Sequence, residues 1–233
     1  MNSQEIGALC DQFSVKHFMF MAPSDDIGSI VGQGLLCYNT IVKKRVTHRS
    51  IADPKIQRRR GTAYRIVDGN QKLLDIHEYV PLFIAMHTPM QYVITTSATT
   101  KGRHAIVSNE DLVFILIDPI RVMQLPGTLI ADGNAAASST QFFSAPDGLS
   151  KLDWDAINSP NEYPQCYDRE WKRCKSAEVL VPQRISPTLV AGLVVNSLAA
   201  QSRVRSRLSS ALGLGSEGTR LTDGVVIDKC YYK

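Results

Sequence analysis

Short runs of apolar residues, bounded by polar or turn-forming residues, constrain the fold of this chain more than any other feature. A buried β-strand needs only about four to eight residues, whereas a helix needs about ten or more. Short apolar runs of this kind occur at residues 15–21, 80–85, 105–107, 112–117, 177–181, 189–195 and 225–227. The pattern predicts a fold in which β-strands dominate the middle of the chain.

Turn-forming and capping residues indicate where helices begin. Residues 22–26 supply turn chemistry after the first apolar run, and a helix is predicted from about Ile27 to a stop at Gly34. Residues 197–212 carry Ala, Leu, Val and Arg at helical spacing. A turn at residues 132–134 precedes a run of small residues, which predicts a further helix continuing to Phe143.

Length and composition restrict the class of protein. The 233 residues suffice for one sizeable core or two small ones, and since we find no internal repeat and no long linker, we predict one domain over residues 1–233. Hydrophobic residues make up 44% and charged residues 21%, close to globular averages. These values exclude a mainly disordered chain, a collagen-like repeat and a coiled coil.

The sequence contains no targeting or membrane signal that we recognise. No apolar run approaches the length of about 18 residues that a spanning helix needs, and residues 1–20 lack the regions of a secretory signal. The five cysteines are odd in number and widely spaced, without a CxxC pair. We therefore predict a cytoplasmic protein with reduced thiols, no metal site and no membrane partner.

Basic residues are concentrated in one segment. The whole chain has 26 Lys and Arg against 22 Asp and Glu, a net charge of +4. Between Ile41 and Arg65 only Asp53 opposes nine basic residues, namely Lys43, Lys44, Arg45, Arg49, Lys55, Arg58, Arg59, Arg60 and Arg65. Such a run is often a solvated helix face, but three consecutive arginines within it favour contacts with phosphates.

Two polar residues lie inside apolar runs. Glu178 is flanked by Ala177 and Val179 in a predicted strand, where a carboxylate costs free energy unless it is paired or used. The alternative is that strand alternation points Glu178 to solvent. His17 lies in the first apolar run, and a single histidine there is more often structural than functional. The chain contains no P-loop, GxGxxG, HExxH or GxSxG motif.

Taken in order and with their spacing, several short blocks resemble the DarT-type DNA ADP-ribosyltransferases, the toxin half of DarT and DarG toxin–antitoxin pairs. The similarity extends over nearly the whole chain. The blocks are residues 35–39 (LLCYN), 49–52 (RSIA), 56–60 (IQRRR), 77–83 (HEYVPLF), 88–90 (TPM), 132–138 (DGNAAAS), 152–154 (LDW), 176–181 (SAEVLV) and 231–232 (YY).

The resemblance implies an α/β (α+β) ADP-ribosyltransferase fold, in which helices flank a split, mainly antiparallel β-sheet core and NAD binds in the cleft as co-substrate. It also implies that Glu178 is the catalytic acidic residue and that Arg60 is the catalytic arginine, which also contacts NAD. This chain has more residues between His17 and Gly34 than the family pattern, and a turn accepts an insertion more readily than a strand. An insertion in the turn at 22–26 is therefore preferred, and it makes His17 the histidine that binds NAD. An ungapped match would place Phe20 there instead.

The resemblance also implies a surface for the DNA substrate. Met90, Asn134 and Lys172 occupy positions similar to the substrate side of the family, and Arg58 and Arg59 add cations that suit a phosphate backbone. A family motif that usually has arginine before Ser-Pro-Met has His87 here. This difference leaves the preferred base and sequence context open.

The leading hypothesis is an enzyme that transfers ADP-ribose from NAD onto a base of single-stranded DNA, thymine rather than guanine, and releases nicotinamide. A transferase of the same fold that modifies RNA or protein is the first alternative. A non-catalytic nucleic-acid-binding module, which would not need Glu178, is the second. The resemblance further implies a macrodomain antitoxin of the DarG type as a partner, and the oligomeric state stays open.

Overall fold

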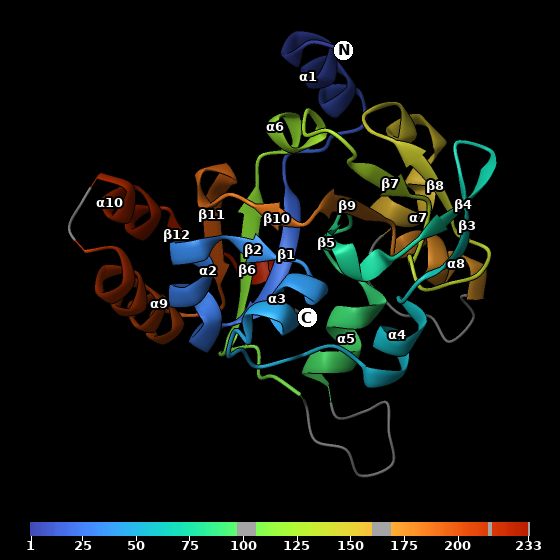
Figure 1. Cartoon of the computed structure of the whole chain (residues 1–233). Coiled ribbons are helices and arrows are strands. Elements are labelled where there is room, and N and C mark those ends of the chain that lie inside the picture. The colour runs from blue at the N-terminus through green and yellow to red at the C-terminus, as the bar shows by residue number, and fades with distance from the viewer. Residues whose placement is uncertain (97–105, 160–168, 214–215, 233) are drawn as a thin grey trace.

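A ten-stranded sheet forms the centre of the molecule in the computed structural model, which describes residues 1–96, 106–159, 169–213 and 216–232. Its strand order is β12-β11-β6-β1-β5-β9-β7-β8-β3-β4 (Figure 1). The strands in that order are β12 (Val225–Ile227), β11 (Val190–Val195), β6 (Leu112–Ile117), β1 (Phe18–Pro23), β5 (Tyr79–Phe83), β9 (Glu178–Pro182), β7 (Leu129–Ala131), β8 (Gln141–Ser144), β3 (Ala63–Val67) and β4 (Asn70–Leu74).

The sheet is split into two halves that meet at one residue pair. β1 pairs with β6 over six residues and β5 pairs with β9 over five, but β1 and β5 pair only at Met19 and Phe83. Adjacent strands are antiparallel except for the pairs β11–β12 and β3–β8. The prediction of a mixed α/β fold with a split, mainly antiparallel sheet is therefore confirmed.

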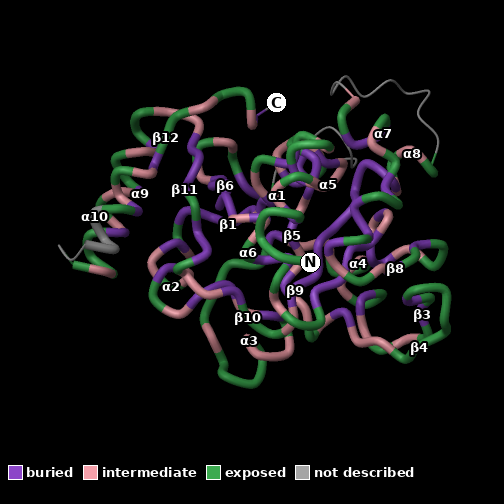
Figure 2. The backbone as a smooth tube through the Cα atoms, turned by 90° about the horizontal axis from the view of Figure 1, so that it is seen from above, coloured by how far each residue is buried: buried purple, intermediate pink, exposed green. Residues whose placement is uncertain are grey.

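Residue alternation along the strands divides the sheet into two faces. Phe18, Leu82 and Val179 lie on one face within the largest apolar cluster. This face packs against α1 (Ser3–Gln12), α2 (Ile27–Gln33), α6 (Pro119–Met123), α9 (Leu198–Leu212) and α10 (Ser216–Asp223). Figure 2 shows the buried residues gathered along the central strands, whereas the β3–β4 hairpin at one end is mostly exposed.

The opposite face carries two smaller apolar clusters. One is built on β1, β6 and α5 (Pro89–Thr95) and includes Met19 and Ile94. The other lies on β7, β8 and β9 and includes Ala131 and Leu180. This face therefore has a separate cluster on each half of the split sheet, and the junction of the halves lies between them.

The remaining elements lie outside the ten-stranded sheet. They are β2 (Leu35–Leu36) with its partner β10 (Arg184–Ile185), α3 (Tyr38–Lys44), α4 (Pro54–Arg59), α7 (Trp154–Asn158), α8 (Arg169–Lys175) and five short 3-10 segments, among them Ser24–Asp26 and Ile76–Glu78, in the part of the chain that the structure describes. The longest helix in the described residues, α9, has 15 residues. No helix in the described residues is long and apolar enough to cross a membrane.

Local signals in the sequence located most of the elements. The apolar runs at 112–117, 177–181, 189–195 and 225–227 contain strands, and the helix predicted from Ile27 begins there as α2 and ends before Gly34. Gly34 has φ +86°, a conformation that glycine adopts without strain. Ala105, in the run at 105–107, lies outside the described residues, as does Cys166. Cys10, Cys37 and Cys174 are buried free thiols.

The helix predicted from the turn at 132–134 to Phe143 is wrong. Turns occupy this stretch and residues 141–144 form strand β8. The Asp132 and Asn134 side chains accept hydrogen bonds from the backbone N–H groups of Gln141 and Ala136. Such local side-chain bonds compete with helical hydrogen bonds, which explains why the small residues do not form a helix.

Candidate active site

Glu178 is buried at the junction of the two half-sheets. It is the first residue of β9 and pairs with Phe83 of β5 on one side and Ala131 of β7 on the other. Phe83 in turn pairs with Met19, so the four residues form one row across the sheet. Because Val179 points into the large cluster, alternation directs the Glu178 side chain onto the face with the two small clusters. Glu178 is 2% exposed, so its side chain does not point to solvent.

Arg60 forms a bidentate ion pair with Glu178. Its Nη1 donates to Oε1 at 3.1 Å and its Nη2 donates to Oε2 at 2.7 Å. The backbone N–H of Ala135 donates a third hydrogen bond to Oε1 at 3.2 Å. The paired hydrogen bonds hold the carboxylate in one orientation, which offsets part of the cost of burying it.

The run of three arginines divides at the end of α4. The Asp53 side chain caps the start of this helix and accepts from the N–H of Lys55 and Ile56. Arg58 and Arg59 lie in the last turn and are exposed, whereas Arg60 follows the helix and is 8% exposed. The carbonyl of Arg60 accepts from the Ile76 N–H, which ties this end of α4 to the start of the 3-10 segment before β5.

Arg173 of α8 holds the loop that presents the Ala135 N–H. It pairs with Asp132 and with Glu170, each at 2.6 Å, and its carbonyl accepts from the Asn134 N–H at 3.0 Å. The hydrogen bonds from Glu170 and then Asp132 raise the pKa of Arg173. A side chain at Gly133 would meet the Arg173 side chain and lie 2.8 Å from its carbonyl oxygen, so the loop requires glycine there. Sequence patterns had not indicated this supporting role.

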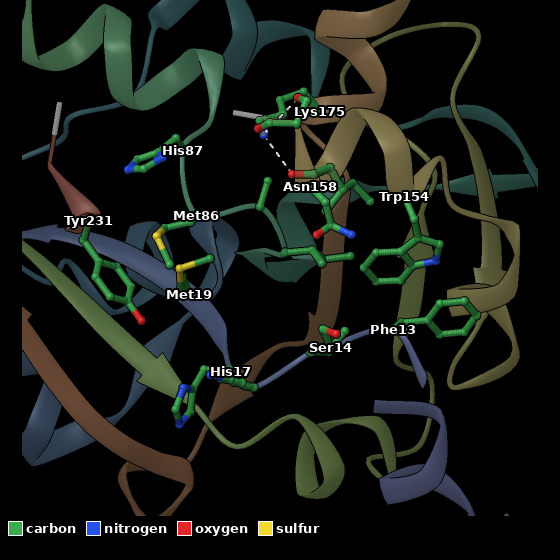
Figure 3. A pocket seen from close by; sticks show the side chains of 16 residues that line it. Phe13, Ser14, His17, Met19, Met86, His87, Trp154, Asn158, Lys175 and Tyr231 are labelled. Atoms are coloured by element: carbon green, nitrogen blue, oxygen red, sulfur yellow. Dashed lines mark hydrogen bonds between the residues drawn. The ribbon is translucent and has the colours of Figure 1, made fainter. Parts of the chain in front are cut away.

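A cavity of about 440 Å³ opens where β1 and β5 diverge. Figure 3 shows Met19 and Met86 close together, with His17 on one side of them and His87 and Lys175 on the other, and Asn158 and Trp154 beside them. Its volume falls within the range of small-molecule sites, about 300–1,000 Å³. The residues that line it do not include Glu178 or Arg60, but Met19 belongs to the same row of the sheet as Glu178.

The two candidates for the NAD histidine position lie on different sides of the sheet. His17 lines the cavity together with Met19, whereas Phe20 packs against the large cluster on the opposite face. Burial, partly offset by Asp118, lowers the pKa of His17, so its imidazole is neutral at pH 7.

Lys175 is a buried cation beside the cavity that the sequence analysis did not single out. It is 3% exposed, and its Nζ donates to the carbonyls of Ile157 and Ser159, both at 2.8 Å. Burial lowers the pKa of Lys175 to about 8. No carboxylate within the described residues pairs with it. Besides the two carbonyls, its Nζ contacts the Ser159 hydroxyl at 3.4 Å and lies 5.9 Å from the centre of the Trp171 ring.

The residues predicted for the DNA surface are only partly brought together. Asn134 is half-buried and directly precedes Ala135, which bonds Glu178. Met90 packs at the start of α5 against the cluster that contains Met19. Lys172 is exposed on α8, and no ion pair of its side chain occurs within the described ranges. The same ranges contain no group of three or more His, Cys, Asp or Glu residues that could hold a metal.

The described residues thus combine a split, mainly antiparallel sheet, a buried carboxylate–guanidinium pair at the junction of its halves and a cavity where the halves diverge. A family model described as "ssDNA thymidine ADP-ribosyltransferase, DarT" matches residues 20–225. The chain belongs to this DarT family.

Two characterised relatives are similar over most of the chain. A DNA ADP-ribosyl transferase of Thermus sp. is 27% identical over 178 residues, which cover 74% of this chain and 78% of the relative. A DNA ADP-ribosyl transferase–DNA ADP-ribosyl glycohydrolase fusion protein of Thermosipho africanus is 23% identical over 195 residues. That match covers 84% of this chain but only 46% of the fusion protein, so this chain spans less than half the length of that relative.

Solved structures of the Thermus protein have the same fold. Its complex with ADP-ribosylated single-stranded DNA superimposes with a TM-score of 0.74 at 23% identity, covering 94% of this chain and 97% of that one. Its complex with NAD+ gives a TM-score of 0.71 at 22% identity, with 94% and 98% covered. At these identities the likeness establishes the fold.

Proposed function

We propose that this chain transfers ADP-ribose from NAD onto a base of single-stranded DNA, thymine in the first instance, and releases nicotinamide. The observation that carries the proposal is the Glu178–Arg60 pair, buried where the half-sheets meet. A non-catalytic binding module would have no need of a charged pair in this position. The description of the family names thymidine, and the Thermus relative has been solved with NAD+ and with modified single-stranded DNA.

The proposed reaction exchanges one bond at the nicotinamide ribose. The bond from its anomeric carbon to the nicotinamide nitrogen breaks and its electron pair leaves with nicotinamide. A ring nitrogen of the base then bonds to the same carbon and gives up its proton. We assign two tasks to Glu178, which are to stabilise the positive charge that develops on the ribose and to accept that proton.

Arg60 is proposed to act beside Glu178 as a permanent cation. A guanidinium has five N–H donors, and the ion pair with Glu178 uses two of them. The remaining donors can bind the NAD pyrophosphate or a carbonyl of the target base. Because Glu178 fixes its orientation, little conformational entropy is lost when substrate binds.

We further propose that NAD occupies the cleft at the β1–β5 divergence, with His17 on its adenosine-side ribose. A neutral imidazole can hydrogen-bond a ribose hydroxyl without adding charge. His17 is preferred over Phe20 because it lies on the cavity side of the sheet. NAD is the only co-substrate the proposal requires, and its chemistry needs no metal.

The acceptor strand is proposed to lie along Asn134, Met90 and Lys172, with Arg58 and Arg59 attracting its phosphates. Lys172, Arg58 and Arg59 are exposed, as residues that contact a phosphate backbone must be. We also propose that residues 1–233 act as one ADP-ribosyltransferase domain. One sheet includes strands from β1 near the start to β12 near the end of the chain, which supports this.

The biological setting belongs to the same proposal. The Thermosipho relative joins a transferase to a glycohydrolase in one chain. A separate macrodomain antitoxin of the DarG type would serve the same purpose here, by removing ADP-ribose that the toxin attaches to DNA. A cytoplasmic location, where NAD and DNA are both available, fits such a toxin.

The test is transfer of labelled ADP-ribose to separate pools of single-stranded DNA, duplex DNA, RNA and protein. We expect label on single-stranded DNA with the wild type, and at least a 100-fold slower reaction with Glu178→Gln, which retains the size of the side chain. Circular dichroism establishes that this variant is folded. Label mainly on RNA or protein would favour the alternative acceptors. If no pool is labelled, the non-catalytic nucleic-acid-binding module is the hypothesis that remains.

A further inference from the structure

A second arginine is buried close to the Glu178–Arg60 pair. Arg65 lies in the middle of β3, is 9% exposed, and alternates with Val67 onto the face of the sheet that carries Glu178. Its Nη2 donates to the Arg59 carbonyl at 2.9 Å. Its Nε is buried and has no hydrogen-bond partner in the described part of the chain.

The charge of Arg65 is not neutralised by the protein. Within the described residues no carboxylate forms an ion pair with it. Burial, and then repulsion from Arg60, lowers its pKa. Of the two buried guanidinium groups, only that of Arg60 is paired with a carboxylate, which leaves the positive charge of Arg65 in excess. A purely structural arginine would be paired, because an uncompensated buried charge destabilises the fold.

We propose that Arg65 binds a phosphate of the single-stranded DNA acceptor, next to the nucleotide that receives ADP-ribose. The inference rests on the proposed function and adds a residue to its acceptor side. A phosphodiester supplies the missing negative charge and oxygen atoms that accept from Nε and from the free Nη1. The bond to the Arg59 carbonyl holds the guanidinium in place beforehand.

The position of Arg65 favours DNA over the NAD pyrophosphate as the source of this phosphate. The cavity assigned to NAD lies on the β1 side of Glu178, whereas β3 lies on the other side, beyond β9, β7 and β8. The exposed cations Arg58 and Arg59 belong to α4, which Arg65 contacts. They extend the positive surface from Arg65 outward, as a path for a phosphate backbone requires.

The first experiment compares Arg65→Gln with Lys72→Gln. Lys72 is the cross-strand partner of Arg65, is exposed, and loses the same charge when substituted. For Arg65→Gln we expect the KM for a thymine-containing oligonucleotide to rise about tenfold or more, with the Kd for NAD unchanged. The slope of log affinity against log salt should fall by about 0.7, the contribution of one single-strand phosphate. Lys72→Gln should change the KM less than twofold.

The main readout of the second experiment needs only the wild-type enzyme. Oligonucleotides that carry one uncharged methylphosphonate linkage, moved stepwise past the target base, are assayed with the wild-type enzyme. We expect one linkage beside the target to raise the KM about as much as Arg65→Gln does. The same linkage should have no further effect on Arg65→Gln, because the two changes remove one contact.

Several outcomes would overturn the inference. A weaker Kd for NAD with an unchanged oligonucleotide KM would assign Arg65 to the pyrophosphate instead. Equal effects of Arg65→Gln and Lys72→Gln on the oligonucleotide KM would mean that Arg65 acts only through the net charge of the protein and not through a specific phosphate contact. The absence of any sensitive linkage in the wild type would also refute it. Failure of the wild type to label single-stranded DNA at all is a different result, which removes the proposed function itself.

Discussion

At the scale of single residues, burial separates arginines that are neighbours in sequence. Arg58 and Arg59 are exposed at the end of α4, and Arg60, one position further, is 8% exposed and bonded to Glu178. The backbone turns at the helix end, where the Arg60 carbonyl accepts from the Ile76 N–H. Identical side chains in one run therefore have different surroundings and are expected to have different functions.

Substitution of these arginines should accordingly have unequal effects. Arg60→Ala leaves the buried Glu178 carboxylate without its two strongest hydrogen bonds, and we expect transfer to fall at least 100-fold. It should also lower the free energy of unfolding by about 3–5 kcal/mol, the usual cost of breaking a buried pair. Arg58→Ala should reduce transfer less than about fivefold.

Labelling rates and urea denaturation of the two variants measure both effects. Arg60→Lys distinguishes the effect of the positive charge from the effect of the bidentate hydrogen bonds to Glu178, because lysine retains the charge but cannot form the bidentate pair. If Arg58→Ala and Arg60→Ala lose transfer equally, the three arginines act as a diffuse patch and Arg60 has no special part in the reaction.

Lys175 predicts a specific pH dependence of stability. Burial lowers its pKa from an ordinary 10.5 to about 8 in the folded protein. Between these values the unfolded chain binds more protons than the folded chain, so the contribution of Lys175 to the free energy of unfolding rises with pH. Relative to Lys175→Met, the wild type should gain stability from pH 8 to pH 10.5.

Urea denaturation of both proteins at several pH values in this window gives the difference directly. Cysteine and tyrosine residues titrate in both proteins, and their effects cancel when the two are subtracted. A difference that stays flat or falls with pH would mean that Lys175 is not desolvated in the folded state.

At the scale of elements, the loop between β7 and β8 connects the fold to the chemistry. Its backbone supplies the Ala135 N–H to Glu178, and Arg173 of α8 holds it through Asp132 and the Asn134 N–H. The loop is therefore fixed by a helix that follows it by some forty residues, not by its own helical propensity. Its small residues allow close approach instead of forming a helix.

Gly133→Ala tests this connection. An added Cβ would lie 2.8 Å from the Arg173 carbonyl oxygen and closer still to its side chain, which forces the loop to shift. We expect stability to fall by about 1–3 kcal/mol and transfer to fall at least tenfold, since a misplacement of about 1 Å is costly in an active site. Gly32→Ala in α2, where a Cβ meets nothing within 4 Å, serves as the control.

Thermal unfolding and labelling rates measure the two variants. Gly32→Ala should be neutral or slightly stabilising, by up to about 1 kcal/mol, because alanine favours the helix interior. Transfer by Gly133→Ala at the wild-type rate would show that Ala135 does not help to orient Glu178.

At the scale of the whole molecule, the proposed substrate surfaces extend from the junction of the two half-sheets, and Met90 of the acceptor surface packs on the β1 half. The cavity assigned to NAD lies towards β1, and the exposed cations assigned to DNA lie on α4 and α8, around the half that contains β9. Glu178 lies between them, in the row where the halves meet. This arrangement lets the two substrates approach the buried pair from different sides.

The arrangement predicts how transfer depends on strand pairing and salt. A paired base must be extruded from the duplex, which costs a few kcal/mol, so transfer to a single strand should be at least tenfold faster than to the same sequence fully paired. Transfer should also weaken as salt rises from about 50 to 200 mM, because phosphate contacts release counterions. Equal labelling of paired and unpaired strands at one salt concentration would contradict the prediction.

Local sequence patterns predicted the parts of the protein that depend on neighbouring residues. The apolar runs located the central strands, and the turn before Ile27 located the start of α2. The carboxylate in the run at 177–181 marked Glu178 as unusual. These features follow from local burial and capping preferences, which act within a few residues of the chain.

Which charged groups meet depends on how distant segments pack together. Glu178 and Arg60 are 118 positions apart, and their contact requires that β9 be placed beside β5 and that α4 end above it. The face on which Glu178 lies, the unpaired state of Arg65 and the bonds from Arg173 to the β7–β8 loop depend on the same assembly. Burial and ion pairing are properties of surroundings built from distant segments, and local sequence patterns therefore could not specify them.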